Sequence, residues 1–280
     1  MKRHYVTMLS IAGSDSSGGA GIQADLKTCS AIGVFGTTAI TAITAQNTCG
    51  VTSVLGMPPE LVTAQIDAVF ADEPVNAVKI GMLFNAEIVH AVAQALLRHK
   101  PRHIVLDPVM ISTSGRQLID DNAIGALMSE LMPISTVVTP NRHEAERLAG
   151  REIKTQGDML GAAECIIAAG ANAVLMKGGH FDSEMMTDLL VEKGESQPLS
   201  LSAPFVNTKN THGTGCTLSS AIASHLALGK PLREAVQAAK TYLSQALQHG
   251  TEMQFGKGNG PVNHFFNPKT PYSKKYDDIH

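Results

Sequence analysis

Short apolar runs alternate along the chain with longer stretches in which apolar residues recur every three or four positions. The runs have the length of β-strands, and the longer stretches have the period of helices with one buried face. Six strands are expected, at Val6–Ile11, Thr38–Ala45, Val75–Ile80, His103–Leu106, Thr136–Thr139 and Ala173–Met176. This alternation predicts an α/β fold with a mainly parallel central sheet and helices on both of its faces.

Helical periodicity is clearest at Ala86–Leu97 and in the stretch from Leu232 to Leu247. Two further runs, Thr187–Glu192 and Leu199–Phe205, flank the turn residues Lys193-Gly194-Glu195 and are expected to form an antiparallel pair. The chain shows no repeat and no low-complexity linker, so residues 1–266 are predicted to form a single domain. Residues 267–280 lack an apolar period and are expected to be a mobile or packing tail.

Composition narrows the class of protein. Apolar residues make up 44% of the 280 residues and charged residues 17%, which allows a large core. Trp is absent and Tyr scarce, so this core consists mainly of aliphatic side chains, as a sheet covered on both faces requires. The net charge of −3, without a basic block before the tail, disfavours a nucleic-acid partner. No apolar run reaches the roughly 18 residues of a membrane span.

The cysteines and the first residues bear on the compartment. The four cysteines form no C-x-x-C pair, and no secretory apolar region follows Met1. A reducing cytoplasm is therefore expected, in which a thiol is free to take part in chemistry.

A glycine-rich loop, Gly13–Gly21, directly follows the first strand. In open α/β sheets, ligands bind at the carboxyl ends of strands, so this loop is expected to line a pocket. Its Gly19-x-Gly21-x-x-Ala24 pattern formally fits a dinucleotide fingerprint. However, the second strand ends in Thr44-Ala45-Gln46-Asn47, without the acid that would hold a ribose. A dinucleotide-dependent oxidoreductase is therefore disfavoured.

Another glycine segment, Gly213-Thr214-Gly215, precedes the apolar-periodic stretch Leu218–Leu228 and so falls at a helix N-terminus. The first N–H groups of a helix lack partners and its dipole attracts negative charge, which makes an anion hole suited to a transferring phosphoryl group. Cys216 is expected in the first turn, where a thiol pKa of about 8.5 tends to fall. The alternative is a tight turn with a buried cysteine.

Several polar residues stand where buried strands or helices are expected. Lys177 follows the strand Ala173–Met176 beside Gly178 and Gly179, and it either reaches a phosphate or is a solvated turn residue. Asp25 shares the inward face of the predicted helix Gly21–Ile32, so its carboxylate meets a ligand or the helix's own N-terminal donors. Gln46 carries a donor and an acceptor side by side, which match an aminopyrimidine edge.

Oxygen ligands also follow two strands. Asp107 closes the strand His103–Leu106, and Asn141 and Glu144 follow the strand Thr136–Thr139. These oxygens are suited to Mg²⁺ together with water and nucleotide phosphates. The alternative for Asn141 and Glu144 is a helix cap with a capping-box turn. The eleven histidines show no zinc-site spacing.

Seven segments in this order resemble a known family. They are Ile11–Asp25, Thr44–Thr48, Lys79–Leu83, Asp107–Met110, Thr139–Glu144, Met176–His180 and Asn210–Thr217. Together they look like the bacterial hydroxymethylpyrimidine/phosphomethylpyrimidine kinases of thiamine biosynthesis, in the ribokinase superfamily. The match runs from about Val6 to Phe265. It implies a ribokinase-like three-layer sandwich and two ATP-dependent steps, which convert 4-amino-5-hydroxymethyl-2-methylpyrimidine to its monophosphate and then to its diphosphate.

The resemblance also implies roles for individual residues. The pyrimidine site would comprise Gly13, Ala20, Asp25, Gln46, Met82, Val109 and Lys240. The ATP site would comprise Asn141, Lys177 and Thr211, with Asp107 and Glu144 serving Mg²⁺. Catalysis would fall to Lys177, Gly213, Gly215 and Cys216. A small-molecule substrate and a homodimer are expected, and a requirement for a monovalent cation is left open.

Cys216 stands where most ribokinase relatives carry an aspartate base, and the pyrimidine kinases characteristically carry cysteine there. We therefore expect Cys216 to matter more in the first step, because the acceptor of the second step is an already ionised phosphate. A pyridoxal or pyridoxine kinase is the nearest alternative function, because that vitamin is also a flat heterocycle with a hydroxymethyl group. A heterocycle-binding protein without catalysis is a second alternative, disfavoured by Lys177 and Glu144.

Overall fold

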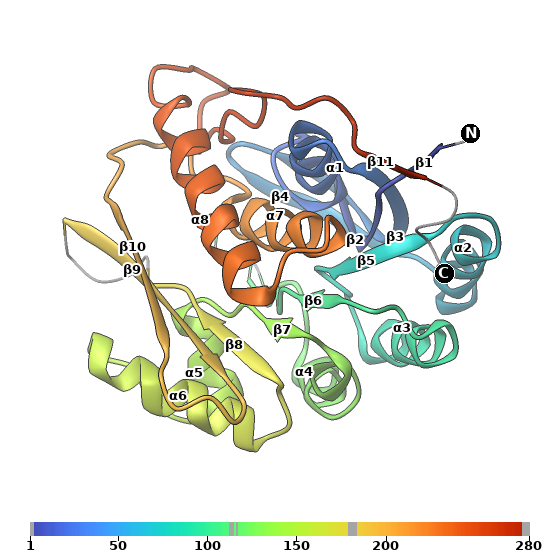
Figure 1. The fold of residues 1–280 in the computed structure, drawn as a ribbon, viewed down its shortest axis with the longest axis horizontal. Coiled ribbons are helices and arrows are strands. Elements are labelled where there is room, and N and C mark those ends of the chain that lie inside the picture. Colours follow the sequence, from blue (N-terminus) through green and yellow to red (C-terminus); the bar gives the residue numbers. More distant parts are fainter. Residues whose placement is uncertain (1–2, 112–114, 116, 179–183, 276–280) are drawn as a thin grey trace.

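The structure is a computed structural model that describes residues 3–111, 115, 117–178 and 184–275. Within these residues, nine strands form one sheet in the order β10-β9-β8-β7-β6-β5-β2-β3-β4 (Figure 1). The strands are β2 (Thr7–Asp15), β3 (Phe35–Asn47), β4 (Gly50–Gly56), β5 (Val75–Ile80), β6 (Ile104–Leu106), β7 (Val137–Val138), β8 (Ala173–Met176), β9 (Met185–Glu192) and β10 (Leu199–Pro204). The six strands from β8 to β3 in this order run parallel, while β4, β9 and β10 are antiparallel additions at the two edges.

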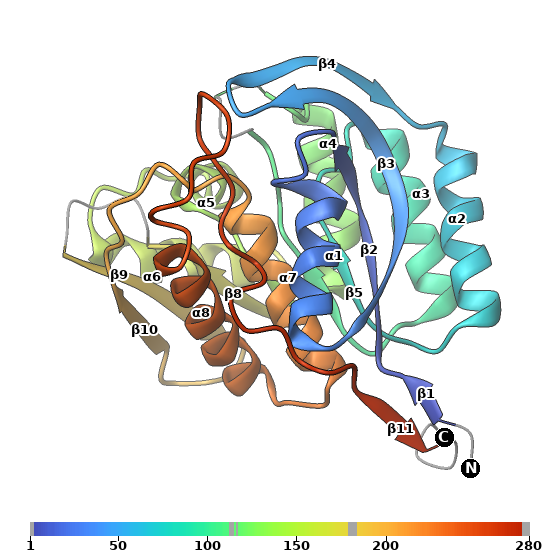
Figure 2. The same cartoon turned by 90° about the horizontal axis from the view of Figure 1, so that it is seen from above.

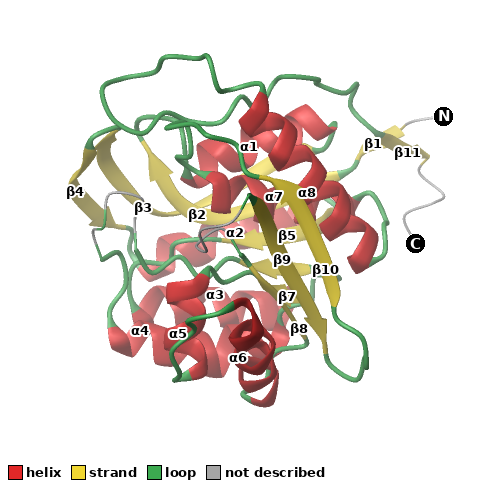
Figure 3. Cartoon of the chain, turned by 90° about the vertical axis from the view of Figure 1, so that its left-hand side faces the viewer, coloured by secondary structure: helices red, strands yellow, loops and turns green. Residues whose placement is uncertain are grey.

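Helices cover both faces of the sheet, as Figure 3 shows from the β10 edge. One face carries α1 (Gly21–Ile32), α7 (Thr214–Ala227) and α8 (Leu232–Gln248). The other carries α2 (Pro59–Asp72), α3 (Ala86–His99), α4 (Asp121–Ala126), α5 (Arg142–Ala149) and α6 (Gln156–Ala168). The helix α4 continues through a π-helical turn at Leu127–Leu131 and a 3-10 turn at Met132–Ile134. The predicted three-layer α/β sandwich is confirmed.

Two hydrophobic cores result from the alternation of side chains along each strand. Leu9 and Ile80 are fully buried under α2 to α6, whereas Met8 and Ala77 are fully buried under α1, α7 and α8. Because both faces are covered, the inner strands are apolar at successive positions, which is why they were recognisable as continuous runs.

Most predicted elements lie where the apolar pattern placed them. The bounds of α1, β5 and β8 match the prediction, and β9 and β10 form the expected antiparallel pair. The helix α7 begins at Thr214, so the predicted place of Cys216 in its first turn is confirmed. The strand β4 was not predicted, because it is an edge strand whose side chains are mostly exposed or half-buried.

The tail takes part in the fold as far as it is described. Its strand β11 (Ser273–Lys275) pairs antiparallel with β1 (Arg3–Tyr5), so the two ends of the described chain lie side by side (Figure 2). The backbone of Tyr272 contacts the residue before β2 and the residue after α1, since its carbonyl accepts from Val6 N–H and its N–H donates to the Gly33 carbonyl. The tail is therefore a packing element up to residue 275. Among the described residues, no helix is long and apolar enough to cross a membrane.

Candidate active site

A cavity of about 1350 Å³ opens at the carboxyl ends of the parallel strands. Among its lining residues are all the predicted site residues except Asp25. These are Gly13, Ala20, Gln46, Met82, Asp107, Val109, Asn141, Glu144, Lys177, Thr211, Gly213, Gly215, Cys216 and Lys240. Segments separated by more than a hundred residues thus meet at one place. Gly179 and His180, which belong to the quoted Met176–His180 segment, lie outside the described residues.

Asp107 is a buried carboxylate of this cavity with three side-chain partners. Its Oδ1 lies 2.9 Å from Lys177 Nζ and accepts from Thr139 Oγ1 at 3.1 Å, while Oδ2 accepts from Ser219 Oγ at 3.2 Å. Burial opposes the charge of Asp107, but the ammonium groups of Lys177 and Lys79 hold the pKa of this carboxyl below its ordinary value. Asp107 therefore remains ionised at neutral pH.

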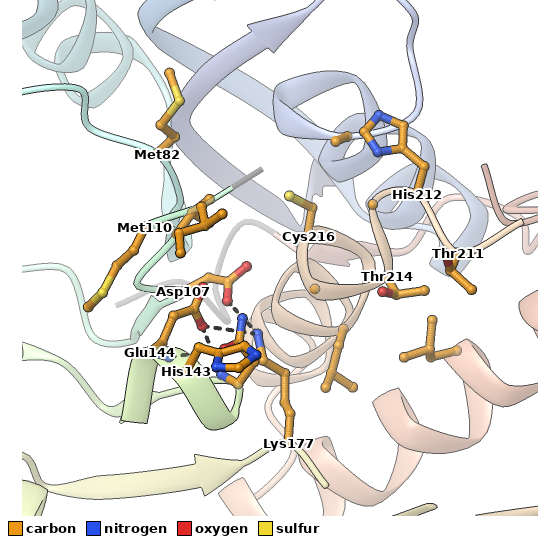
Figure 4. Close-up of a pocket in the computed structure, with 18 of the residues that line it drawn as sticks. Met82, Asp107, Met110, His143, Glu144, Lys177, Thr211, His212, Thr214 and Cys216 are labelled. Atoms are coloured by element: carbon orange, nitrogen blue, oxygen red, sulfur yellow. Dashed lines mark hydrogen bonds and ion pairs between the residues drawn. The ribbon is translucent and has the colours of Figure 1, made fainter. Parts of the chain in front are cut away.

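Glu144 shares the same lysine at a greater distance, as Figure 4 shows. Lys177 Nζ lies 3.8 Å from Glu144 Oε2, and Glu144 is itself buried. Burial raises the pKa of Glu144 to about 7, against the pull of Lys177 and with a further upward push from Asp107. Glu144 and Asn141 also form the capping box of α5, so the structural alternative for these two residues is confirmed. Glu144 can cap α5 and still belong to the site, since Lys177 lies beside the same carboxylate.

The start of α7 faces this charged cluster. Gly213 has φ +79°, a left-handed conformation, and a side chain there would collide with the Gly19 carbonyl. A Cβ at Gly215 would lie 3.4 Å from Lys177 Nζ and 3.5 Å from Asp107 Oδ2. The N–H groups that start α7 and the Lys177 ammonium thus face one region, which suits an anion.

Cys216 lies half-buried in the first turn of α7, but the expected fall in its pKa is wrong. Burial raises the pKa of this thiol to about 11, even though the Lys79 ammonium works in the opposite direction. The helix N-terminus favours the thiolate by a small amount compared with the cost of desolvating it. Cys216 is accordingly a neutral thiol at physiological pH.

Asp25 does not line the cavity, which corrects its predicted place in the pyrimidine site. It is fully buried, with Lys79 Nζ 2.8 Å and Ser10 Oγ 2.6 Å from its Oδ2. The residue that lines the cavity at this point is Lys79, also fully buried. Burial opposes its charge, but Asp25 holds the pKa of Lys79 above its ordinary value. The signal for Lys79 was a lysine within a mostly apolar inner strand, which requires a buried partner.

Lys240 also departs from the prediction. Its Nζ lies 2.7 Å from Asp188 Oδ2 on β9, close to one edge of the sheet, whereas Gln46 ends β3 close to the other edge. Lys240 therefore lies at the β9 end of the cavity and not beside Gln46. The predicted role of Lys240 came from the family resemblance, which does not give its ion pair with Asp188.

Two residues of the cavity were missed as functional candidates, although both occur within the quoted segments. His212 Nε2 lies 2.9 Å from Asp15 Oδ2 and 3.2 Å from Gln46 Nε2, and both His212 and Asp15 are buried. Asp15 also accepts the backbone N–H groups of Gly19 and Ala20. Although burial opposes ionisation, these hydrogen bonds lower the pKa of Asp15 to about 2. An acid and a histidine beside glycines were the available signal.

The described residues contain no cluster of three or more His, Cys, Asp and Glu side chains suited to hold a metal ion by themselves. Asp107 and Glu144 remain as two carboxylates at one lysine, an arrangement that suits a Mg²⁺ ion whose other ligands are phosphates and water.

A ribokinase-like sandwich with a lysine, two carboxylates and a helix N-terminus around one cavity defines a small-molecule kinase. A sequence model of the phosphomethylpyrimidine kinase family matches residues 15–263. The chain belongs to this family. It is 53% identical over 258 residues to the hydroxymethylpyrimidine/phosphomethylpyrimidine kinase of Rhizobium meliloti (strain 1021), covering 92% of this chain and 96% of that protein.

Solved structures show the same relationship. The crystal structure of phosphomethylpyrimidine kinase from Clostridium difficile 630 superposes with a TM-score of 0.76 at 46% identity, over 86% of this chain and 99% of that one. The ADP complex of Bacillus subtilis pyridoxal kinase has a TM-score of 0.85 at 35% identity, over 94% of this chain and 98% of that one. The family resemblance seen in the sequence is confirmed.

The raised pKa of Glu144 predicts a pH dependence of stability. The folded protein keeps a proton on Glu144 up to a pH of about 7, whereas the unfolded chain releases it near 4.5. The contribution of Glu144 to the free energy of unfolding therefore falls as the pH rises through this window. Glu144→Gln keeps the cap of α5 but cannot ionise. From about pH 5 to about pH 8, the wild type should lose up to about 3 kcal/mol relative to this variant.

Urea unfolding of both proteins at the two pH values measures this difference. Parallel behaviour of wild type and Glu144→Gln across the window would show that Glu144 is ionised well below neutrality in the folded state.

Proposed function

We propose that the protein phosphorylates 4-amino-5-hydroxymethyl-2-methylpyrimidine with ATP, first to the monophosphate and then to the diphosphate, for thiamine diphosphate biosynthesis. The observation that carries the proposal is that Lys177, Asp107 and the N-terminus of α7 share one cavity with Gln46. Phosphate chemistry and an amide able to pair with an aminopyrimidine edge are thereby combined. Family membership supports the same reaction.

In this proposal, the residues act mainly by position and charge. The Lys177 ammonium and the N–H groups that start α7 stabilise the charge spread over the transferring phosphoryl group. Asn141 and Thr211 line the cavity together with Lys177 and are assigned to the ATP phosphates. Gly13 lies near the end of β2 and Ala20 in the loop that follows it, and Met82 packs against Gly13, where a Cβ would come within 2.8 Å of its Cε. These residues, with Val109, are assigned to the pyrimidine.

Magnesium is assigned to Asp107 and Glu144. Two carboxylates share one lysine here, and the second of them has a pKa of about 7 because its charge is incompletely compensated. A divalent cation would complete that compensation, so the donor set fits the ion. When bound with ATP, Mg²⁺ would neutralise charge on the phosphates. Glu144 would release its proton as the ion binds.

Cys216 is assigned as the group that receives the alcohol proton in the first step. Only the thiolate form of Cys216 can take this proton, and because burial raises the pKa of the thiol to about 11, a small fraction of the protein carries the thiolate at neutral pH. We infer that this thiolate takes the proton late, once the oxygen has begun to bond to phosphorus, as a loose transition state allows, and becomes the neutral thiol. The acceptor of the second step is an ionised phosphate and has no such proton to lose.

The function is tested by ADP release from Mg-ATP in the presence of hydroxymethylpyrimidine, its monophosphate or pyridoxal. Both pyrimidines should be phosphorylated, and Lys177→Met should lower kcat by roughly 10²-fold or more. Pyridoxal is included because the Bacillus subtilis pyridoxal kinase shares the fold over nearly the whole chain. Turnover of pyridoxal alone would replace the proposal with the alternative function. The absence of ADP release with all three would refute kinase activity on these substrates.

Separate assays of the two steps test the role of Cys216. In Cys216→Ser, the first step should slow by roughly 10²-fold, the lower range of general-base contributions, and the second by much less. Cys165→Ser makes the same chemical change at an exposed position on α6 and is the matched control. Equal losses in both steps would assign Cys216 a structural or positioning role instead.

We also propose that the protein is a cytoplasmic homodimer. Four unpaired cysteines fit a reducing compartment.

Ile43 and Leu55 are cross-strand partners at the β3–β4 edge, and 48% and 65% of their respective surfaces are exposed. Such an apolar pair fits an interface between two copies. Leu55→Lys should shift the sedimentation coefficient toward that of a monomer, whereas Leu97→Lys on α3 should not; a monomeric wild type would contradict the dimer.

A further inference from the structure

His212 connects the glycine loop after β2 with the end of β3. It follows Thr211 in the segment that leads into α7, and its Nε2 lies between Asp15 Oδ2 at 2.9 Å and the side-chain amide of Gln46 at 3.2 Å. Its ring also fills the space that a side chain at Gly19 would occupy. The position of His212 is therefore set from two sides, by the Asp15 carboxylate and by the Gly19 backbone.

The hydrogen on His212 Nε2 can be assigned from its neighbours. Asp15 accepts hydrogen bonds from the N–H of Ser17, Gly19 and Ala20 and from the hydroxyl of Ser17. A carboxylate that receives so many donors is ionised and can only accept. The Nε2 atom that faces it at 2.9 Å must consequently carry a hydrogen. This hydrogen is also the one nearest to the Gln46 amide.

The amide of Gln46 is constrained in turn. If its Nε2 faced His212, two N–H donors would oppose one another at 3.2 Å. At its other side the amide lies 3.3 Å from Thr44 Oγ1, whose hydroxyl hydrogen is already donated to the Ser14 carbonyl at 2.9 Å. Thr44 Oγ1 can therefore only accept from Gln46. A half-turn of the amide, which preserves its shape, places Oε1 against His212, where it shares the single Nε2 hydrogen with Asp15, and Nε2 against Thr44, where it donates to Oγ1.

We propose that His212 is a specificity-determining positioning residue, which fixes the order of acceptor and donor that Gln46 presents to the substrate. Oε1 uses one of its two acceptor positions on His212, and Nε2 uses one of its two hydrogens on Thr44. The substrate therefore meets one remaining acceptor on the His212 side and one remaining donor on the Thr44 side. The backbone of Gln46 cannot shift to escape this order, because Ser16 Oγ donates to its carbonyl and accepts its N–H. The inference rests on the proposed function.

This order selects one orientation of an aminopyrimidine. The 4-amino group donates to Oε1 and ring atom N3 accepts from Nε2, so the amino group lies on the His212 side. The 5-hydroxymethyl group is next to the amino group and on the side away from N3. It is therefore directed past His212, along the segment that continues into Gly213 and Cys216. The reversed amide order would turn the hydroxymethyl group toward Thr44.

The matching probe is the 4-oxo analogue of the substrate, 5-hydroxymethyl-2-methylpyrimidin-4-one. Its carbonyl accepts where the amino group donates, and its N3–H donates where N3 accepts. In the productive orientation it requires Gln46 Nε2 on the His212 side, which the His212 N–H opposes. The wild type should prefer the amino compound over the oxo compound in kcat/KM by roughly 10- to 100-fold, as expected for a bidentate contact.

The test compares this preference in variants of His212. In His212→Phe the amide of Gln46 is free to turn, so the preference should fall at least about tenfold, whatever happens to the overall rate. His212→Gln restores an N–H near the position of Nε2 and should restore the preference. Ser17→Ala is the control, since it removes a donor to Asp15 and loosens the same loop without touching the Gln46 amide. It should keep the wild-type preference.

The outcomes separate this inference from the proposed function. If the wild type phosphorylates neither pyrimidine, the proposed function fails. If the wild type prefers the amino compound and His212→Phe keeps that preference, the function stands and the role of His212 is refuted. An equal loss of preference in Ser17→Ala and His212→Phe would likewise refute it, because loop closure and not the His212 N–H would then set the selectivity.

Discussion

The buried carboxylate of Asp107 is the interaction on which the site depends. A charge inside a protein is tolerated only when its partners are all in place, and those of Asp107 come from the ends of β7 and β8 and from α7. Any other strand order, or another entry of α7, would leave this carboxylate without compensation. The contacts that stabilise this charge therefore also bring Lys177 and the α7 N-terminus to the same point.

Lys177 gives two neighbouring carboxylates different proton affinities. Asp107, at 2.9 Å, stays ionised, whereas Glu144, at 3.8 Å and equally shielded from water, has a pKa near neutrality. The shorter distance to Lys177 contributes to this difference, because Coulomb interactions are strong where water is excluded, and the Lys79 ammonium and the Thr139 hydroxyl stabilise the charge of Asp107 further. The cavity therefore combines one permanent negative charge with one that responds to a bound cation.

The sequence alone was sufficient for the framework and insufficient for the pairings. We could locate β5, β8 and α1 from their apolar residues, because burial on one or both faces places apolar residues at regular intervals in the sequence. Hydrogen-bond partners produce no such pattern. Lys79 meets Asp25 across 54 positions and His212 meets Asp15 across 197, so both pairs become visible only when the sheet is assembled. For the same reason, the helix context of Cys216 was predicted while the effect of burial on its pKa was not.

The contact between the ring of His212 and Gly19 has a consequence for the history of this family. A side chain at position 19 would overlap that ring, and a side chain at position 213 would overlap the Gly19 carbonyl. The two loops cannot therefore diverge independently, since any residue larger than glycine at position 19 requires a smaller one at position 212. Among relatives, residues 19 and 212 should therefore change together. A relative that prefers a different heterocyclic substrate should differ in both loops.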